Sequence, residues 1–151
     1  VVNIFLPCLW AFLACGAFCI VFELRHWRFI LAASLTGAVG WLVYLLLDGR
    51  GSVARFFLAT IAAAMLSELF ARILKTPATV FLTIGIIPLV PGGGIYYALE
   101  ALINGDMPLF VQQGLKTAAS AGAIAVGASL VSSAARIAAL LRQKRSGERS
   151  R

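Results

Sequence analysis

"IPLVPGGGIYY", residues 87–97, places two prolines and three consecutive glycines inside a long apolar stretch. Proline has no backbone N–H to donate within a helix, and glycine destabilises helical structure. The nearest charged residues on either side of this segment are Lys75 and Glu100. The segment therefore predicts an interruption within a helix that is otherwise apolar enough to cross a membrane.

The composition of the whole chain is that of a membrane protein. Of its 151 residues, 61% are hydrophobic and 13% are charged, and the mean hydropathy is +0.94. A spanning helix needs about 20 consecutive apolar residues. The chain offers five such stretches, so we predict an all-α integral membrane protein with about five transmembrane helices, the fourth broken at Pro-Gly-Gly-Gly. The expected helices cover residues 2–22, 29–47, 53–74, 77–103 and 116–141.

The connections between these helices are short, which predicts a single transmembrane bundle over residues 1–141 and a basic tail over residues 142–151. Ser52 and Thr76 are placed to cap the third and fourth helices, because a hydroxyl side chain can accept a free N–H there. Asn104 and Gly105 are typical of a helix end. The first stretch has no basic leader, so we expect it to be a span and not a signal peptide.

The positive charges are unevenly distributed along the chain. Ten of the 13 Lys and Arg residues fall on one predicted side of the membrane, and only Arg50, Arg55 and Lys116 fall on the other. This asymmetry predicts an external N-terminus and a cytoplasmic tail. A basic segment beside a helix end is typical of contact with anionic lipid headgroups, so we do not expect nucleic-acid binding.

Small residues recur at helical spacing in the second and fifth expected helices, as in Ala33, Gly37 and Gly40. Small side chains let membrane helices approach closely, so these faces are expected to pack within the chain or against a partner. Cys8, Cys15 and Cys19 share one face of the first helix, without a His or carboxylate nearby. We expect them to be small buried side chains and predict no metal site and no cofactor.

Glu68 and Arg72 lie four residues apart on the third expected helix and therefore face the same way. Two interpretations remain open. They could form a salt bridge whose arginine reaches the cytoplasmic headgroups, or Glu68 could line a solute pathway and couple transport to proton movement.

The interruption itself predicts a binding site near the middle of the membrane. Pro88 and Pro91 cannot donate to the carbonyl groups of Ile84 and Ile87, and a second half-helix would begin near Gly94. Its first free N–H groups, expected at Ile95, Tyr96 and Tyr97, would attract a carboxylate. The alternative is a proline kink packed on a neighbouring helix. The predicted substrate-binding residues are Pro88, Pro91, Gly92, Gly93, Gly94, Tyr96 and Tyr97.

The segment "SELFARILKTPATVFLTIGIIPLVPGGGIYYALEALINGD", residues 67–106, resembles the signature region of the threonine/serine exporter family. The resemblance is to its small membrane subunit, which corresponds to the C-terminal half of the fused exporters. It extends over essentially the whole chain and includes "GAVGWLVY" at residues 37–44.

The resemblance implies a subunit of a bacterial inner-membrane exporter for threonine and serine, driven by the proton gradient. In relatives the substrate is a dicarboxylate such as succinate. A larger membrane subunit is the implied partner, and a homo-oligomer is left open. A non-transporting subunit that only assembles or stabilises its partner is the other class of function that fits. No nucleophile–base pair or catalytic carboxylate pair is evident in the spans, so we do not expect an enzyme and predict no catalytic residues.

Overall fold

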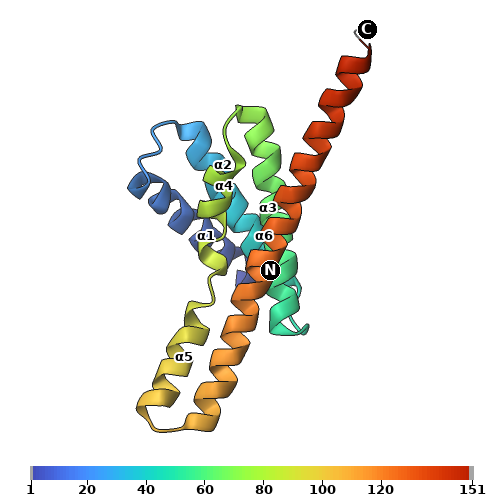
Figure 1. Ribbon diagram of the computed structural model, residues 1–151. Helices are drawn as coiled ribbons and strands as arrows, with labels where there is room; N and C mark the ends of the chain where they lie inside the picture. Colours follow the sequence, from blue (N-terminus) through green and yellow to red (C-terminus); the bar gives the residue numbers. More distant parts are fainter. Residues whose placement is uncertain (1, 150–151) are drawn as a thin grey trace.

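The computed structural model describes the backbone of residues 2–149 and the side chains of residues 4–141. Every regular element in this part of the chain is helical (Figure 1), which confirms the predicted all-α fold. The elements in chain order are α1 (Val2–Val21), α2 (Trp27–Leu46), α3 (Ser52–Leu74), α4 (Ala78–Gly85), the 3-10 helix η1 (Ile87–Leu89), α5 (Gly92–Ile103) and α6 (Met107–Arg149).

Four of these helices, α1, α2, α3 and α6, are individually long and apolar enough to cross a membrane. Two further pieces, Ala78–Leu89 and Gly92–Ile103, are bent by 45° relative to each other and together form either one broken span or a re-entrant loop. Figure 1 places the turn after α5 at the opposite end of the molecule from the turn before α4. The structure thus has four or five candidate spans and a bent helix pair at the predicted interruption, consistent with the predicted all-α membrane fold.

The last helix is longer than expected at both ends. It begins at Met107 and not at 116, because the carboxylate of Asp106 accepts the N–H of Leu109 at 3.0 Å and so caps the first turn. It also continues past residue 141 to Arg149, so most of the expected tail 142–151 has a helical backbone. Residues 150–151 lie outside the part that the structure describes.

The predicted caps are placed correctly at one end only. Ser52 is already the first residue of α3, and Gly51 occupies the cap position. The hydroxyl of Thr76 donates to the carbonyl of Leu74 at 3.1 Å, back toward α3, and therefore does not cap α4. At the end of α5 the prediction is confirmed, because Gly105 takes a φ of 77° that a residue with a side chain rarely adopts.

Helix α2 packs against α1, α3 and α4, and its small residues permit this close approach. A side chain at Gly37 would collide with the sulfur of Cys15 on α1, which is fully buried. At Gly40, an added Cβ would lie 3.3 Å from Ala63 on α3. Since lipid provides no hydrophobic drive for helix association, these short contacts supply the dispersion energy that holds the bundle together.

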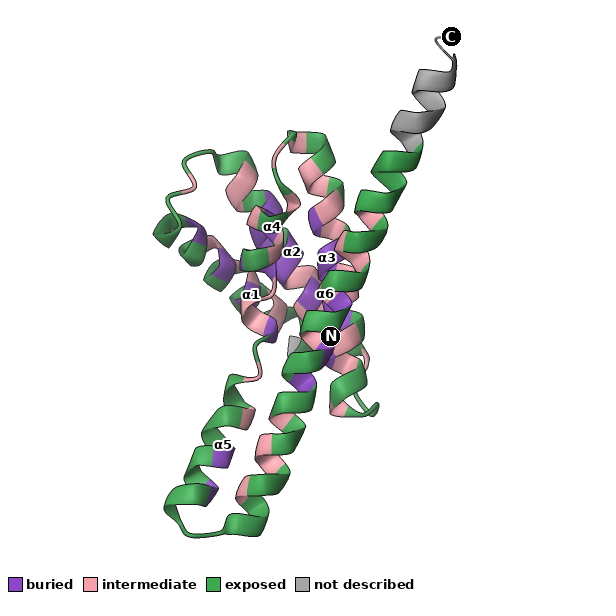
Figure 2. Ribbon diagram, viewed as in Figure 1, coloured by how far each residue is buried: buried purple, intermediate pink, exposed green. Residues whose placement is uncertain are grey.

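Helix α5 packs on α6, and the two form a hairpin that extends away from the other helices, past the α2–α3 turn (Figure 1). Gly94 sets the spacing at the root of the hairpin, because a side chain there would collide with Thr117 on α6. Ala98 and Ala101 are buried residues of α5, whereas most of its remaining surface is exposed (Figure 2). The break between α4 and α5 is therefore also the point where the chain leaves the bundle.

The five-span arrangement predicts the side of the membrane on which each turn lies. In a background without the native cysteines, Arg50→Cys and Asn104→Cys should react with a membrane-impermeant maleimide added to intact cells. Arg25→Cys, in the turn between α1 and α2, should react only after permeabilisation. If position 104 also reacts only after permeabilisation, residues 77–103 enter the membrane and return to the same side without crossing it.

Candidate functional site

The break between α4 and α5 is a short, tightly hydrogen-bonded turn. The N–H of Leu89 donates to the carbonyl of Ile86 at 2.9 Å, and that of Val90 donates to Ile87 at 3.2 Å. The N–H of Gly92 donates to Val90 at 2.7 Å. These bonds satisfy much of the backbone that proline leaves unpaired, as the interior of a membrane requires.

The carbonyl groups expected to be free are in fact occupied. The carbonyl of Ile84 accepts the thiol of Cys15 at 3.5 Å, and that of Ile87 accepts the N–H of Val90. Each of these two carbonyls therefore already has one hydrogen-bond donor within the protein. The thiol comes from α1, which is distant in sequence from α4, so the sequence contained no local signal for this bond.

The free N–H groups also differ from those expected. Helix α5 begins at Gly92, two residues earlier than expected, and its first helical bond runs from the N–H of Ile95 to the carbonyl of Pro91 at 3.3 Å. Within the described residues, the N–H groups of Gly93 and Gly94 make no hydrogen bond. These two amides, and not those of Ile95, Tyr96 and Tyr97, are the free donors at the positive end of α5.

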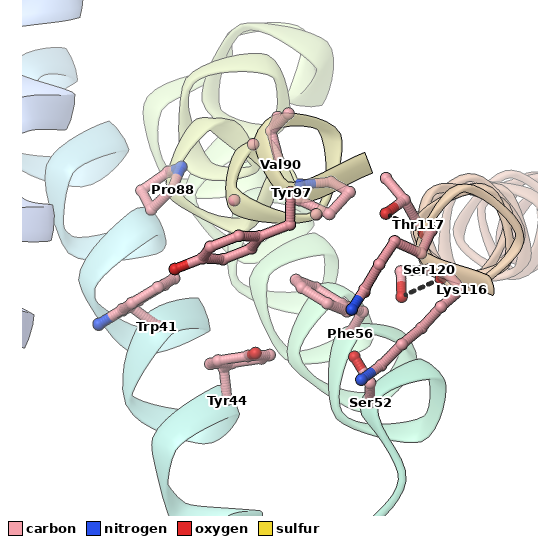
Figure 3. A pocket seen from close by; sticks show the side chains of 15 residues that line it. Trp41, Tyr44, Ser52, Phe56, Pro88, Val90, Tyr97, Lys116, Thr117 and Ser120 are labelled. Carbon is pink, nitrogen blue, oxygen red and sulfur yellow. Dashed lines mark hydrogen bonds between the residues drawn. The ribbon is translucent and has the colours of Figure 1, made fainter. Parts of the chain in front are cut away.

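A cavity of about 320 Å³ lies beside the break, between α2, α3, α5 and α6 (Figure 3). We refer to it as the break cavity. Its lining includes the turn residues Pro88, Val90, Pro91, Gly92, Gly93 and Gly94. An added Cβ would meet nothing within 4 Å at Gly92, and at Gly93 only an edge atom of Tyr97 at 4.0 Å. These two glycines leave space beside the turn that side chains would otherwise reduce.

One side of the break cavity is aromatic. Its members are Trp41, Tyr44, Phe56 and Tyr97, which we call the aromatic wall. Trp41 stacks on Tyr44 with ring centroids 5.2 Å apart, and Tyr44 lies 4.8 Å from Phe56. Arg55 holds this stack from outside, because its guanidinium lies 4.2 Å from the Tyr44 ring and pairs with Asp48 at 2.9 Å.

The other side of the break cavity is polar. Its members are Ser52, Gln113, Lys116, Thr117 and Ser120, which we call the polar wall. In Figure 3, Lys116 extends from α6 toward Ser52, at the start of α3. Two of the hydroxyl groups are already used within α6, since Thr117 donates to the carbonyl of Gln113 at 2.7 Å and Ser120 to that of Lys116 at 2.9 Å.

A break that presents free amides to a polar and aromatic cavity is typical of a transporter site near the membrane midplane. Residues 7–134 match the family model described as "Threonine/Serine exporter, ThrE". The chain belongs to the threonine/serine exporter family. Neither the search of curated proteins nor the search of solved structures found a match. Members of this family are transporters and not enzymes.

In this exporter-family chain, six of the seven predicted substrate-binding residues line the break cavity. The exception is Tyr96, which is 63% exposed and packs edge-on against Tyr97, with ring centroids 5.4 Å apart. Successive residues on a helix point about 100° apart, so Tyr96 and Tyr97 do not face the same space.

Glu68 and Arg72 lie elsewhere in the molecule. They line a separate groove of about 840 Å³ between α2, α3 and α6, which we call the Glu68 groove; its other lining residues are apolar. Within residues 4–141 the structure contains no ion pair between Glu68 and Arg72. At about 1.5 Å per residue, Glu68 lies about 18 Å along α3 from Phe56 in the break cavity.

Our sequence interpretation missed the polar wall of the break cavity and, apart from Tyr97, the aromatic wall. The aromatic wall draws residues from α2, α3 and α5, and hydropathy alone does not show that these meet. Lys116 did carry a signal: no other charged residue lies between Asp106 and Arg136, in a stretch rich in apolar and small residues. An ionisable residue in such a place is a candidate functional group by default, yet we counted it only as a topological charge.

Gly93→Val should strongly reduce export without disturbing the fold. A valine there has room beside the turn but fills part of the break cavity, so we expect export to fall by at least about tenfold, the effect of losing about 1.4 kcal/mol of ligand binding. Export of labelled threonine by cells and the melting temperature of the purified protein are the two measurements.

Two further glycine variants serve as controls for this result. Gly114→Val lies on α6 outside the break cavity and has open space around the added Cβ, so it should leave both measurements unchanged. Gly94→Val collides with Thr117 and should lower the melting temperature itself. Normal export by Gly93→Val would mean that the break is only a packing kink.

Proposed function

We propose that this chain is one subunit of a secondary exporter in the bacterial inner membrane. The exporter moves small metabolites that carry a carboxylate, most of all threonine and serine, and is driven by the proton gradient. The family match supports an amino-acid exporter, while the substrate, the coupling and the subunit role are our proposal. The break cavity is the proposed substrate site.

The observation that carries this proposal is the free start of α5 inside the break cavity. The N–H groups of Gly93 and Gly94 have no acceptor among the described residues, and the positive end of the helix dipole lies at the same point. Unsatisfied donors within a membrane cost several kcal/mol each, so a ligand or water has to supply the acceptor. A carboxylate provides charged acceptor atoms and suits a helix N-terminus.

The proposed partner is a larger membrane subunit of the same exporter family. Exposed apolar residues on α5, among them Ile95, Leu99 and Leu102, support an environment of lipid or protein around the hairpin. A complete pathway would then form between the two subunits, with the break cavity on one side of it.

Proton coupling is proposed to act through Glu68. Its side chain is half-buried in the Glu68 groove, where every lining residue other than Glu68 and Arg72 is apolar. The groove and the break cavity share α3 and α6, so a shift of these helices could transmit the protonation state from one to the other. Direct contact between proton and substrate is not required, given the separation of about 18 Å along α3.

Export assays on cells that express the chain with and without its larger partner test the function directly. We expect threonine and serine export only when both subunits are present, and we expect a protonophore to abolish it. Succinate export under the same conditions would change the substrate but keep the transporter. Full export by the partner alone would show that this chain is a non-transporting assembly subunit.

Glu68→Gln should separate coupling from folding. The amide keeps the shape of the side chain but cannot carry the proton, so export should become independent of the proton gradient while the complex still assembles. Glu100→Gln is the matched control, since Glu100 is exposed on α5 and lines neither cavity. A wild-type response to the proton gradient in Glu68→Gln would refute the coupling role.

A further inference from the structure

Lys116 is the one residue of the types Lys, Arg, Asp and Glu among those that line the break cavity. Within residues 4–141 it forms no ion pair, and no Asp or Glu lines the cavity. Figure 3 shows its side chain extended toward Ser52, beside Phe56. Lys116 is exposed in this structure, and with no protein anion beside it, its ammonium group is available to pair with an anion supplied by the ligand.

The other nearby cation is already neutralised. Arg55 pairs with Asp48 at 2.9 Å, donates to the carbonyl of Tyr44 at 3.2 Å and covers the ring of Tyr44. These three contacts hold the guanidinium behind the aromatic wall, and Arg55 does not line the break cavity. The cavity therefore offers a ligand a single uncompensated positive charge.

We propose that Lys116 sets the ligand charge that the break cavity accepts, by binding one carboxylate and leaving no cation for a second. This inference rests on the proposed function, because it concerns the same cavity. The free amides of Gly93 and Gly94 supply further donors from the turn. A ligand with one carboxylate can use Lys116 and these amides together, whereas a dicarboxylate finds no second cation among the residues that line the cavity.

The aromatic wall strengthens this preference. In Figure 3, Trp41 and Tyr97 lie on the opposite side of the cavity from Lys116. The face of an aromatic ring is negative, so it repels a carboxylate and attracts an ammonium group. A zwitterion with its carboxylate at Lys116 and its ammonium toward Trp41 satisfies both walls at once. The second carboxylate of a dicarboxylate would meet the aromatic faces.

Trp41 provides a binding signal that does not depend on transport. With Trp10→Phe and Trp27→Phe, the full chain in lipid nanodiscs retains Trp41 as its single tryptophan, in the wall of the cavity. The probes are L-threonine, L-threonine amide, which lacks the carboxylate, and succinate. We expect L-threonine to bind this otherwise unaltered chain more tightly than either of the other two probes.

Lys116→Gln should raise the Kd for L-threonine by at least about tenfold, as expected for the loss of a charged hydrogen-bond partner. The Kd of Lys116→Arg for L-threonine should stay close to that of the wild type, because the positive charge is kept. The weak binding of L-threonine amide should not change in either variant. Arg50→Gln, which removes an exposed cation outside the cavity, is the matched control. Unchanged L-threonine binding by Lys116→Gln would overturn the proposal and leave Lys116 as an anchor at the membrane surface.

Gln113→Lys tests the charge rule by gain of function. Gln113 lines the polar wall one turn before Lys116, so a lysine there adds the second cation that a dicarboxylate needs. We expect the Kd for succinate to fall by about tenfold relative to that for L-threonine. Equal affinity of the wild-type cavity for succinate and L-threonine would overturn the inference while keeping the exporter. No Trp41 response to any carboxylate in the wild-type cavity would overturn the proposed function as well.

Discussion

The structure depends on one constraint, which is that backbone N–H and C=O groups inside a membrane need partners. An unbroken helix meets this constraint by itself, but Pro88 and Pro91 remove two donors from the fourth span. Other donors take their place: the thiol of Cys15 donates to the carbonyl of Ile84, and the N–H of Val90 donates to that of Ile87. Gly93 and Gly94, whose N–H groups make no hydrogen bond among the described residues, line the break cavity.

Close helix packing determines what surrounds this turn. Gly40 lets Leu89 of η1 approach α2, with an added Cβ only 3.4 Å from the leucine side chain. Gly94 lets α6 approach the start of α5, and this contact brings Lys116 into the break cavity one residue before Thr117. The glycines thus act mainly by allowing contact. None of Gly92, Gly93 and Gly94 adopts a positive φ, so their value here is space and not unusual backbone geometry.

The molecule separates its two candidate functional groups. Glu68 lies in the Glu68 groove, and Lys116 lies in the break cavity, yet α3 and α6 contribute to both. Under the proposed function, proton and substrate would influence each other through the relative position of these two helices. Their contact includes Gly127, where an added Cβ would lie 3.1 Å from the carbonyl oxygen of Phe57.

Several features of this protein follow from the sequence alone, because their causes are local. Hydropathy determines the number of spans, since each helix must satisfy its own backbone in lipid. Proline and glycine determine where the fourth span breaks, because their effect on the backbone does not depend on distant residues. The motifs around residues 67–106 were likewise sufficient to predict the family that the match over residues 7–134 confirmed.

The remaining features were decided by tertiary structure, because they depend on which faces of separate helices meet. The thiol of Cys15 reaches the carbonyl of Ile84 only after α1 has packed near α4. The free amides are those of Gly93 and Gly94, and not those of Ile95 and its neighbours as predicted, because α5 begins two residues earlier than expected. Lys116 lines the break cavity because α6 starts at Met107 and packs antiparallel along α5. The local sequence around Lys116 does not predict this packing.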